Sequence, residues 1–336
     1  MSPHDEEALL QVDNLAKAFS VRRSPRERLR RGDAPRAVAV DGVSFTVARR
    51  ETLGIVGESG SGKTTLARCL IRLVEPDAGS IRFSGNNVTG SSQADLQRIR
   101  RRMQMVFQDP YASLNPRVKI GVAIAEPALV HGVIDRGGRK QHVDHMLELV
   151  GLPASAADRY PRQLSGGQRQ RVAIARALSL EPEFLIADEP VSALDVSIQA
   201  QILNLLEDLA SSLSLTMVFI AHQLSVVRHV SDRVAIMYLG RIVEIASTEQ
   251  VFEAPQHPYT VGLLEAAPRP DPERRHRNPA LQGDIPSPIR IPSGCRFRTR
   301  CQHAEDRCAS DDPKLRQIAD QHLVACHVLP FKEASQ

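Results

Sequence analysis

The chain has 336 residues, a formal net charge of +4 and no tryptophan, and aromatic residues make up only 4% of it. This length accommodates one large core, or one domain of usual size with appendages. The small net charge and the scarcity of aromatic side chains argue against a nucleic-acid partner, because such binders rely on basic surfaces and stacking platforms.

No apolar stretch reaches the roughly 18–20 residues that a transmembrane helix needs. The most apolar run, Leu215 to Ala221, has only the length of a strand. The N-terminal sequence MSPHDEEALL is acidic and lacks the apolar centre of an export signal. We therefore expect the chain to stay in the cytoplasm and to act at a membrane only through other chains.

In chain order, residues 11–19 and 37–56 carry alternating or continuous apolar patterns that predict strands. Between them lies the Arg-rich stretch 22–36, which predicts an exposed, solvated loop; contact with anionic lipid head groups is the alternative. The pattern over 63–73 predicts a helix.

Residues 109–182 show helical patterns and no clear strand. Strand patterns return at FLIAD and LTMVFIA, and then as a hairpin, VAIMY–LG–RIVEI. This order predicts a parallel α/β core that is interrupted by a helical insertion.

The composition changes near residue 250, since half of the 22 prolines and four of the five cysteines lie in 251–336. This predicts a C-terminal appendage that is poor in regular structure. We divide the chain into an α/β core (1–108 and 183–250), a helical subdomain (109–182) and the appendage (251–336).

A glycine-rich motif lies between the strand TLGIV and the predicted helix, and it matches G-x-x-x-x-G-K-[ST]. Glycines let backbone N–H groups turn toward phosphates, and the helix N-terminus adds positive potential. In this interpretation Lys63 reaches the β- and γ-phosphates, Thr64 ligates Mg²⁺ and Thr65 lies near the α-phosphate. A simple Gly-rich turn is the alternative, and the flanking elements argue against it. The predicted nucleotide-binding residues are Gly57, Glu58, Ser59, Gly60, Ser61, Gly62, Lys63, Thr64 and Thr65.

The buried run FLIAD ends in two adjacent carboxylates, Asp188 and Glu189. Because neighbouring strand side chains diverge, one carboxylate can hold Mg²⁺ while the other faces the attacking water. We assign Asp188 to the metal and Glu189 to general-base or water-polarising duty. Two acids after a strand can instead cap a helix, but their combination with a phosphate loop favours the nucleotide site.

A second candidate anion site is Leu164-Ser165-Gly166-Gly167-Gln168, which opens the helix RQRVAIARAL. Ser165 is a favourable N-cap, and the two glycines expose the backbone of a helix N-terminus. One chain needs only one phosphate cradle, so this second site suggests that the helix completes the nucleotide site of another subunit.

With these motifs, in this order, residues 11–250 closely resemble the ABC ATPase family. The resemblance implies an α/β fold of the P-loop NTPase (RecA-like) type: a parallel sheet core with an antiparallel β part and a helical insertion. Here the Cys- and Pro-rich C-terminal appendage would be added to it.

The resemblance also assigns roles to single residues. Gln108, in FQDP, matches the loop that senses Mg²⁺ and contacts membrane subunits, and His222 matches the switch histidine at the γ-phosphate. A buried structural histidine is the alternative for His222. Phe19 falls where the family places an aromatic ring under the adenine. The residues that resemble the loop between subunits are Ser192, Ala193, Leu194 and Asp195.

The mechanism implied by the resemblance is ATP-driven dimerisation. Two cassettes sandwich ATP between the Lys63 cradle of one and the Leu164–Gln168 motif of the other, and hydrolysis reopens the sandwich. The expected partners are two transmembrane permease subunits and a second ABC ATPase, which is a paralogue or a copy of this chain. No nucleic-acid partner is expected.

Three further stretches are similar to the ATPases of peptide and nickel importers: FQDPYASLNPR, DEPVSALDVSIQAQILNLL and His257-Pro258-Tyr259-Thr260. This resemblance implies that the chain powers the import of di- or oligopeptides and acts at the cytoplasmic face of the membrane. An extracytoplasmic peptide-binding protein would deliver the peptides. The alternatives are another cargo such as nickel, or an ABC ATPase outside transport. Intact Glu189 and His222 argue against a module that binds ATP without hydrolysing it.

Four cysteines lie in a segment that is too poor in apolar residues to fold unaided, where a metal centre could supply the missing cross-links. Some members of the family carry a [4Fe–4S] cluster at these positions, which favours an iron–sulfur site here. Structural zinc is the alternative, and unligated thiols are the third possibility. The predicted ligands are Cys295, Cys301, Cys308 and Cys326.

Overall fold

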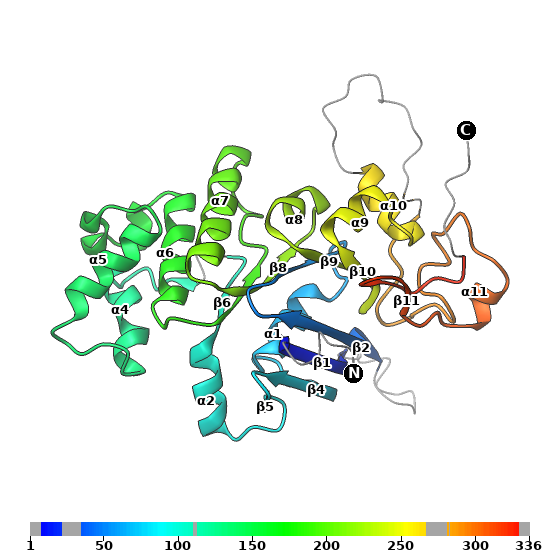
Figure 1. Ribbon diagram of the computed structural model, residues 1–336, viewed down its shortest axis with the longest axis horizontal. Helices are drawn as coiled ribbons and strands as arrows, with labels where there is room; N and C mark the ends of the chain where they lie inside the picture. The colour runs from blue at the N-terminus through cyan, green and yellow to red at the C-terminus, as the bar shows by residue number, and fades with distance from the viewer. Residues whose placement is uncertain (1–7, 22–34, 110–112, 267–280, 282, 329–336) are drawn as a thin grey trace, which may run out of the picture. The chain divides into compact units, whose positions relative to one another are not determined.

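A computed structural model describes residues 8–21, 35–109, 113–266, 281 and 283–328 (Figure 1). Most of the Arg-rich stretch, residues 22–34, therefore lies outside the described residues. The chain forms two compact units and passes between them several times. Unit 1 comprises Met1–Leu10, Thr46–Leu53 and Arg82–Ala221, and unit 2 comprises Gln11–Phe45, Gly54–Ile81 and His222–Gln336.

Three neighbouring parallel strands form the sheet of unit 1: β6 (Met103–Val106), β7 (Phe184–Asp188) and β8 (Thr216–Ala221). Every residue of β7 and β8 is buried. Strands covered on both faces carry continuous apolar runs, which is why FLIAD and LTMVFIA were recognisable in the sequence. Both strand predictions are confirmed.

The helical part of unit 1 contains α4 (Ile120–Val130), α5 (Arg139–Leu149) and α6 (Gly166–Leu178), which pack against one another (Figure 1). Within 113–182, the structure has helices and short 3₁₀ turns and no strand, as the pattern predicted. Unit 1 also contains α2 (Gln93–Arg102) and α7 (Val196–Ser212).

The antiparallel sheet of unit 2 is built around β9 (Arg233–Tyr238) and β10 (Arg241–Ser247). The two residues between them, Leu239 and Gly240, have φ values of 42° and 83°. Positive φ at both central residues matches the twist of a two-residue hairpin, so the predicted hairpin is confirmed.

The C-terminal region contains more regular structure than its composition predicted. Strand β12 (His322–Val324) pairs with β10, and β11 (Arg316–Ala319) pairs with β12. Among the described residues after β10, the chain forms α9 (Thr248–Glu253), α10 (Pro258–Ala266) and α11 (Arg307–Ser310). The tail thus extends a sheet of unit 2.

The N-terminal part of the chain contributes to both units. Four of its strands have residues in each unit: β1 (Ala8–Ser20), β2 (Arg36–Ala48), β3 (Thr52–Val56) and β4 (Ala78–Phe83). The two-residue strand β5 is Asn86–Asn87. Helices α1 (Lys63–Leu70) and α8 (Leu224–Val230) belong to unit 2. Among the helices of the described residues, none is both long and apolar enough to cross a bilayer.

Candidate active site

The predicted site residues are divided between the two units. Phe19, residues 57–65 and His222 lie in unit 2, whereas Gln108, Asp188, Glu189 and the motifs at 164–168 and 192–195 lie in unit 1. Each group is described within its own unit.

The backbone of the predicted phosphate loop requires glycine at specific positions. Gly62 has a φ of 105°, and a Cβ there would lie 1.9 Å from the carbonyl oxygen of Ala39. At Gly57 a Cβ would lie 2.1 Å from the carbonyl oxygen of Met237. Distances below 3 Å cannot be accommodated by rotating a side chain when the neighbour is backbone. The loop is therefore packed tightly into its surroundings, unlike an ordinary surface turn.

Lys63 begins α1, and its side chain is turned back into the loop. It is 4% exposed, and its ammonium group donates hydrogen bonds to the carbonyl oxygens of Gly57 at 2.6 Å and Glu58 at 3.0 Å. Thr64 and Thr65 follow on the first helical turn, where they are half-buried. A buried cation, a glycine-rich loop and a helix N-terminus together form a binding site for phosphate.

Asp188 and Glu189 have different environments at the end of β7. Asp188 is 1% exposed, whereas Glu189 is half-buried and has a φ of 46°. The Glu189 N–H donates to the carbonyl oxygen of Ile220 at 3.0 Å, which holds the residue in this left-handed conformation. Positive φ in a non-glycine residue is uncommon and occurs often at functional sites. The N-cap of the next helix is Asp195, so neither acid acts as the helix cap considered above.

The structure brings Gln108 and Glu189 together. They follow the adjacent parallel strands β6 and β7, and Gln108 Nε2 donates a hydrogen bond to Glu189 Oε2 at 2.7 Å. The amide thus contacts the carboxylate that is predicted to polarise water. Strand adjacency, which the sequence alone does not specify, produces this contact.

The predicted signature motif forms the N-terminus of α6. Ser165 accepts a hydrogen bond from the N–H of Gln168 at 3.3 Å, and the Gln168 side chain accepts one from the Ser165 N–H at 3.1 Å. This capping box fixes the start of the helix. A Cβ on Gly167 would lie 2.5 Å from Ile198 Cγ2, so glycine also permits close approach to α7. Leu164 is buried immediately before the cap.

The 192–195 turn is hydrogen-bonded to the residue that follows β7. The Ser192 hydroxyl donates to the backbone oxygen of Glu189 at 3.0 Å. The Gln199 side chain donates to the carbonyl oxygens of Val191 at 3.0 Å and Leu194 at 2.9 Å. A Cβ on Gly166 would lie 3.3 Å from Leu194 Cδ2, which places the signature motif beside this turn.

The remaining predicted residues of the site are exposed. Phe19, at the end of β1, is 42% exposed, and Lys17 Nζ lies 5.5 Å from its ring centroid. An accessible ring can stack on a base. His222 is also exposed, so the alternative of a buried structural histidine is excluded.

The four C-terminal cysteines lie close to one another. The Cys295 N–H donates to the backbone oxygen of Cys308 at 2.8 Å. Burial, with a smaller contribution from neighbouring thiols, raises the pKa of Cys295 and Cys326 to about 11 and also raises the pKa of Cys301. Over the part of the chain that the structure describes, however, no three Cys, His, Asp or Glu side chains are arranged to hold a metal ion. The predicted ligand set is therefore not assembled in this structure.

Sequence reasoning did not connect two C-terminal residues with the phosphate loop. Tyr259 Oη accepts a hydrogen bond from the Glu58 N–H at 2.9 Å, and Arg300 contacts the Glu58 carboxylate at 2.6 and 3.0 Å. Tyr259 lies in the stretch His257–Thr260 that the sequence singled out, and Arg300 lies beside the predicted ligand Cys301, but no local pattern indicates a partner more than 200 positions away.

A glycine-rich loop around a buried lysine, followed by a helix, defines a nucleotide-binding P-loop protein. A buried strand that ends in two acids is an arrangement by which P-loop ATPases hold Mg²⁺ and orient water. The class is therefore a P-loop ATPase.

Comparison with family models identifies two regions. Residues 40–192 match the model described as ABC transporter, and residues 243–308 match the model described as oligopeptide/dipeptide transporter, C-terminal region. A putative peptide import ATP-binding protein of Brucella ovis is 51% identical over 321 residues, covering 96% of this chain and 98% of that protein. An oligopeptide transport ATP-binding protein of Bacillus subtilis is 46% identical over 331 residues, covering 98% of this chain and 99% of that protein.

Solved structures agree with this assignment. A dimeric ATP-binding cassette in a post-hydrolysis state with ADP and phosphate has a TM-score of 0.62 and 27% identity, covering 71% of this chain and 98% of that chain. A component of an ABC transporter complex from Clostridium perfringens has a TM-score of 0.63 and 27% identity, covering 74% of this chain and 92% of that chain. The chain belongs to the ABC transporter family, and it is an ATP-binding, ATP-hydrolysing subunit.

Proposed function

We propose that this ATPase powers the import of di- or oligopeptides. The observation that carries the proposal is that relatives named for peptide import match along nearly the whole chain, including the region of the C-terminal model at 243–308. Peptide cargo is favoured over nickel because these relatives are named for peptide transport. Cargo recognition belongs to other subunits, so the assembled transporter is the object to test.

The test is cargo-stimulated ATP hydrolysis. The chain would be reconstituted in liposomes with permease subunits, a partner ATPase and a peptide-binding protein. Hydrolysis would then be measured with a panel of di- to hexapeptides or with Ni²⁺. We expect peptide-loaded binding protein to stimulate hydrolysis and Ni²⁺ to have no effect. If Ni²⁺ stimulated ATP hydrolysis and peptides did not, the result would refute peptide import and support nickel as the cargo.

For ATP binding, we propose that Lys63 binds the β- and γ-phosphates, Thr65 lies near the α-phosphate and Phe19 stacks on the adenine. The buried position of Lys63 and the exposed ring of Phe19 support these roles. Thr64, Asp188 and Gln108 have oxygen atoms of the kind that Mg²⁺ prefers, and we assign them to it. When bound, Mg²⁺ neutralises charge on phosphate oxygens.

For hydrolysis, we propose that Glu189 polarises the attacking water, with Gln108 orienting its carboxylate. The 2.7 Å hydrogen bond between the two side chains supports this pairing. His222 is assigned to the γ-phosphate, and its exposure leaves the imidazole accessible.

We further propose that two cassettes close on ATP through the motif at 164–168. Its capped helix N-terminus, with two glycines in the first turn, suits an anion supplied by another subunit. The dimeric cassette among the similar solved structures supports such an arrangement. The partner cassette is a paralogue or a second copy, and two permeases and an extracytoplasmic peptide-binding protein complete the complex. The chain would act peripherally at the cytoplasmic face of the membrane.

The [4Fe–4S] assignment of Cys295, Cys301, Cys308 and Cys326 remains a proposal, with zinc as the alternative. It is supported by the grouping of the four cysteines in the C-terminal region, where the Cys295 N–H donates to the backbone oxygen of Cys308 at 2.8 Å. Because these thiols are not arranged to hold a metal ion in the described structure, we assign no step of the ATPase cycle to a metal bound by the four cysteines. The test is metal content after anaerobic purification.

A further inference from the structure

The C-terminal region contacts the predicted phosphate loop through Glu58, within unit 2. The guanidinium group of Arg300 donates to both carboxylate oxygens of Glu58, at 2.6 and 3.0 Å. The Arg300 side chain is 4% exposed and that of Glu58 is 25% exposed. A two-pronged, largely buried ion pair of this kind is stronger and more directional than a surface pair. The hydrogen bond with Glu58 also raises the pKa of Arg300, so the guanidinium group stays protonated.

The C-terminal region also holds the backbone of Glu58. Its N–H donates to Tyr259 Oη at 2.9 Å. Tyr259 packs at 4.7 Å from Tyr238 and 5.4 Å from Phe297, measured between ring centroids, and the Arg300 guanidinium lies 5.8 Å from the Tyr238 ring. An aromatic cluster therefore fixes the position of both groups that contact Glu58.

Tyr259 is itself positioned by a buried polar network. The Tyr259 N–H donates to His257 Nδ1 at 3.0 Å, and the His257 N–H donates to the Glu244 carboxylate at 2.9 Å. Burial lowers the pKa of His257 to about 4, so its ring is neutral and can accept this bond at physiological pH. His322 contacts the same carboxylate at 2.7 Å.

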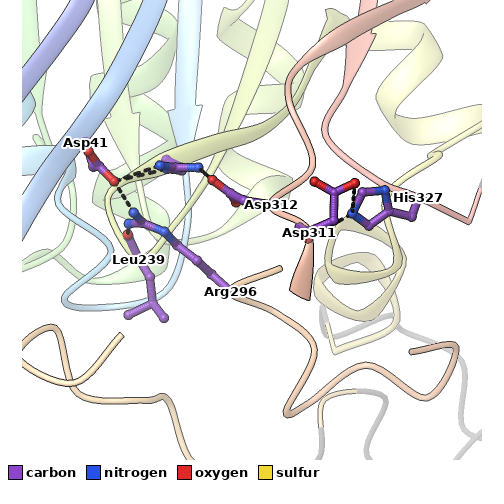
Figure 2. Close-up of polar contacts among 7 residues, drawn as sticks. Asp41, Leu239, Arg296, Asp311, Asp312 and His327 are labelled. Carbon is purple, nitrogen blue, oxygen red and sulfur yellow. Dashed lines mark hydrogen bonds and ion pairs between the residues drawn. The ribbon is translucent and has the colours of Figure 1, made fainter. Parts of the chain in front are cut away.

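A second set of contacts joins the C-terminal region to the phosphate loop through the β9–β10 hairpin. Figure 2 shows the contacts around Asp41 and Arg296. Asp41 forms ion pairs with Arg241 and Arg296, and Arg296 also donates to the carbonyl oxygen of Leu239. Although burial opposes its ionisation, the two guanidinium groups lower the pKa of Asp41. The adjacent Gly240 N–H donates to the backbone oxygen of Ser61 in the loop at 2.8 Å.

We propose that Arg300, supported by Tyr259, is a positioning residue for ATP binding: it neutralises Glu58 and holds the phosphate loop in its binding conformation. Lys63 hydrogen-bonds to the carbonyl oxygen of Glu58, so the position of Glu58 also affects the cation that faces the phosphates. Without Arg300, a carboxylate of the loop would repel the triphosphate. The C-terminal region thereby sets the affinity of this ATPase for its nucleotide.

The test is a double-mutant cycle on the full chain, with Kd for ATP measured by calorimetry and KM and kcat measured in the assembled transporter. We expect Arg300→Gln to raise Kd and KM about ten-fold, because a partner of a buried charge is lost. The value of kcat should stay within about two-fold, since the hydrolytic residues of unit 1 are unchanged. Adding Glu58→Gln should restore most of the affinity, because the repelling charge is then gone.

The matched control is Arg298→Gln. Arg298 lies in the same segment, and its guanidinium group donates to the carbonyl and hydroxyl oxygens of Ser293 within that segment. This variant should keep wild-type affinity. Tyr259→Phe removes a single oxygen and should weaken binding about three-fold, which keeps the proposal testable if Arg300→Gln does not fold. Wild-type Kd in Arg300→Gln, or a double variant no better than the single one, would overturn the proposal.

This inference rests on the proposed assignment of residues 57–65 to the phosphates. Lys63→Ala tests that assignment separately, because it should abolish ATP binding whether or not Arg300 has any role. Retained binding in Lys63→Ala would refute the loop assignment, whereas an effect of Lys63→Ala with none of Arg300→Gln would refute only the positioning role.

Discussion

Replacing Glu189 with glutamine isolates the charge of the proposed water-polarising group. A glutamine has nearly the same shape, and its carbonyl oxygen can still accept the hydrogen bond that Gln108 donates at 2.7 Å. The left-handed backbone, with φ at 46°, is held by the bond to Ile220 and does not depend on the carboxylate. The substitution therefore removes one negative charge and leaves the local geometry in place.

The expected loss follows from the role of the charge. A positioned general base contributes about 10²–10⁴-fold to rate, or roughly 3–5 kcal/mol of barrier. We expect kcat for ATP hydrolysis to fall by that factor, with Kd for ATP unchanged. The complex should then persist as a closed, ATP-bound dimer.

The assay is steady-state phosphate release from the assembled transporter, with Kd measured in parallel. Glu207→Gln makes the same chemical change at an exposed position of α7 and should behave as wild type. Retention of more than about a tenth of wild-type kcat, a barrier change below roughly 1.4 kcal/mol, would refute the assignment of Glu189.

Three further predictions concern the other parts of the molecule. Ser165→Glu should block ATP-dependent dimerisation, measured by light scattering. The substitution places a negative charge at the N-terminus of α6, which would face the γ-phosphate of the ATP bound by the other subunit. Loss of ATP binding by the monomer would contradict this prediction. Anaerobically purified protein should contain about four irons per chain and absorb near ~400 nm, and Cys301→Ser should remove both while ATP binding persists; stoichiometric zinc would support the alternative metal. In metal-free protein, the raised pKa of about 11 for Cys295 and Cys326, against 9.0 for an ordinary thiol, means that the folded state retains protons as pH rises above 9. The two thiols therefore leave the free energy of unfolding unchanged below pH 9 and lower it progressively between pH 9 and pH 11. The Tm of a Cys295→Ser/Cys326→Ser variant should then fall less over this interval than the Tm of the wild type. Equal falls in Tm would refute the description of these thiols as buried.

The regular elements could be predicted because their patterns are local. FLIAD and LTMVFIA are continuous apolar runs because strands of a parallel sheet are covered on both faces. The Leu239–Gly240 hairpin follows from two short apolar runs around a two-residue turn. The helix at 63–73 was predicted too long, since α1 ends at Leu70 and a turn follows.

The tertiary contacts of the site could not be predicted in the same way. The bond between Gln108 and Glu189 depends on β6 lying beside β7, and the pair Arg300–Glu58 joins residues 242 positions apart. Gly167 was explained by exposure of a helix N-terminus, whereas the structure adds a steric reason, its contact with Ile198. The strands of the tail were missed because β12 is only three residues long and is stabilised by pairing with β10.

The most direct test of the account is ATP-dependent uptake of a labelled tripeptide into liposomes that contain the assembled transporter. We predict that the tripeptide accumulates with the wild-type chain and ATP, and that no accumulation occurs with Glu189→Gln. Hydrolysis of ATP by the wild-type assembly without uptake of any peptide would contradict the account.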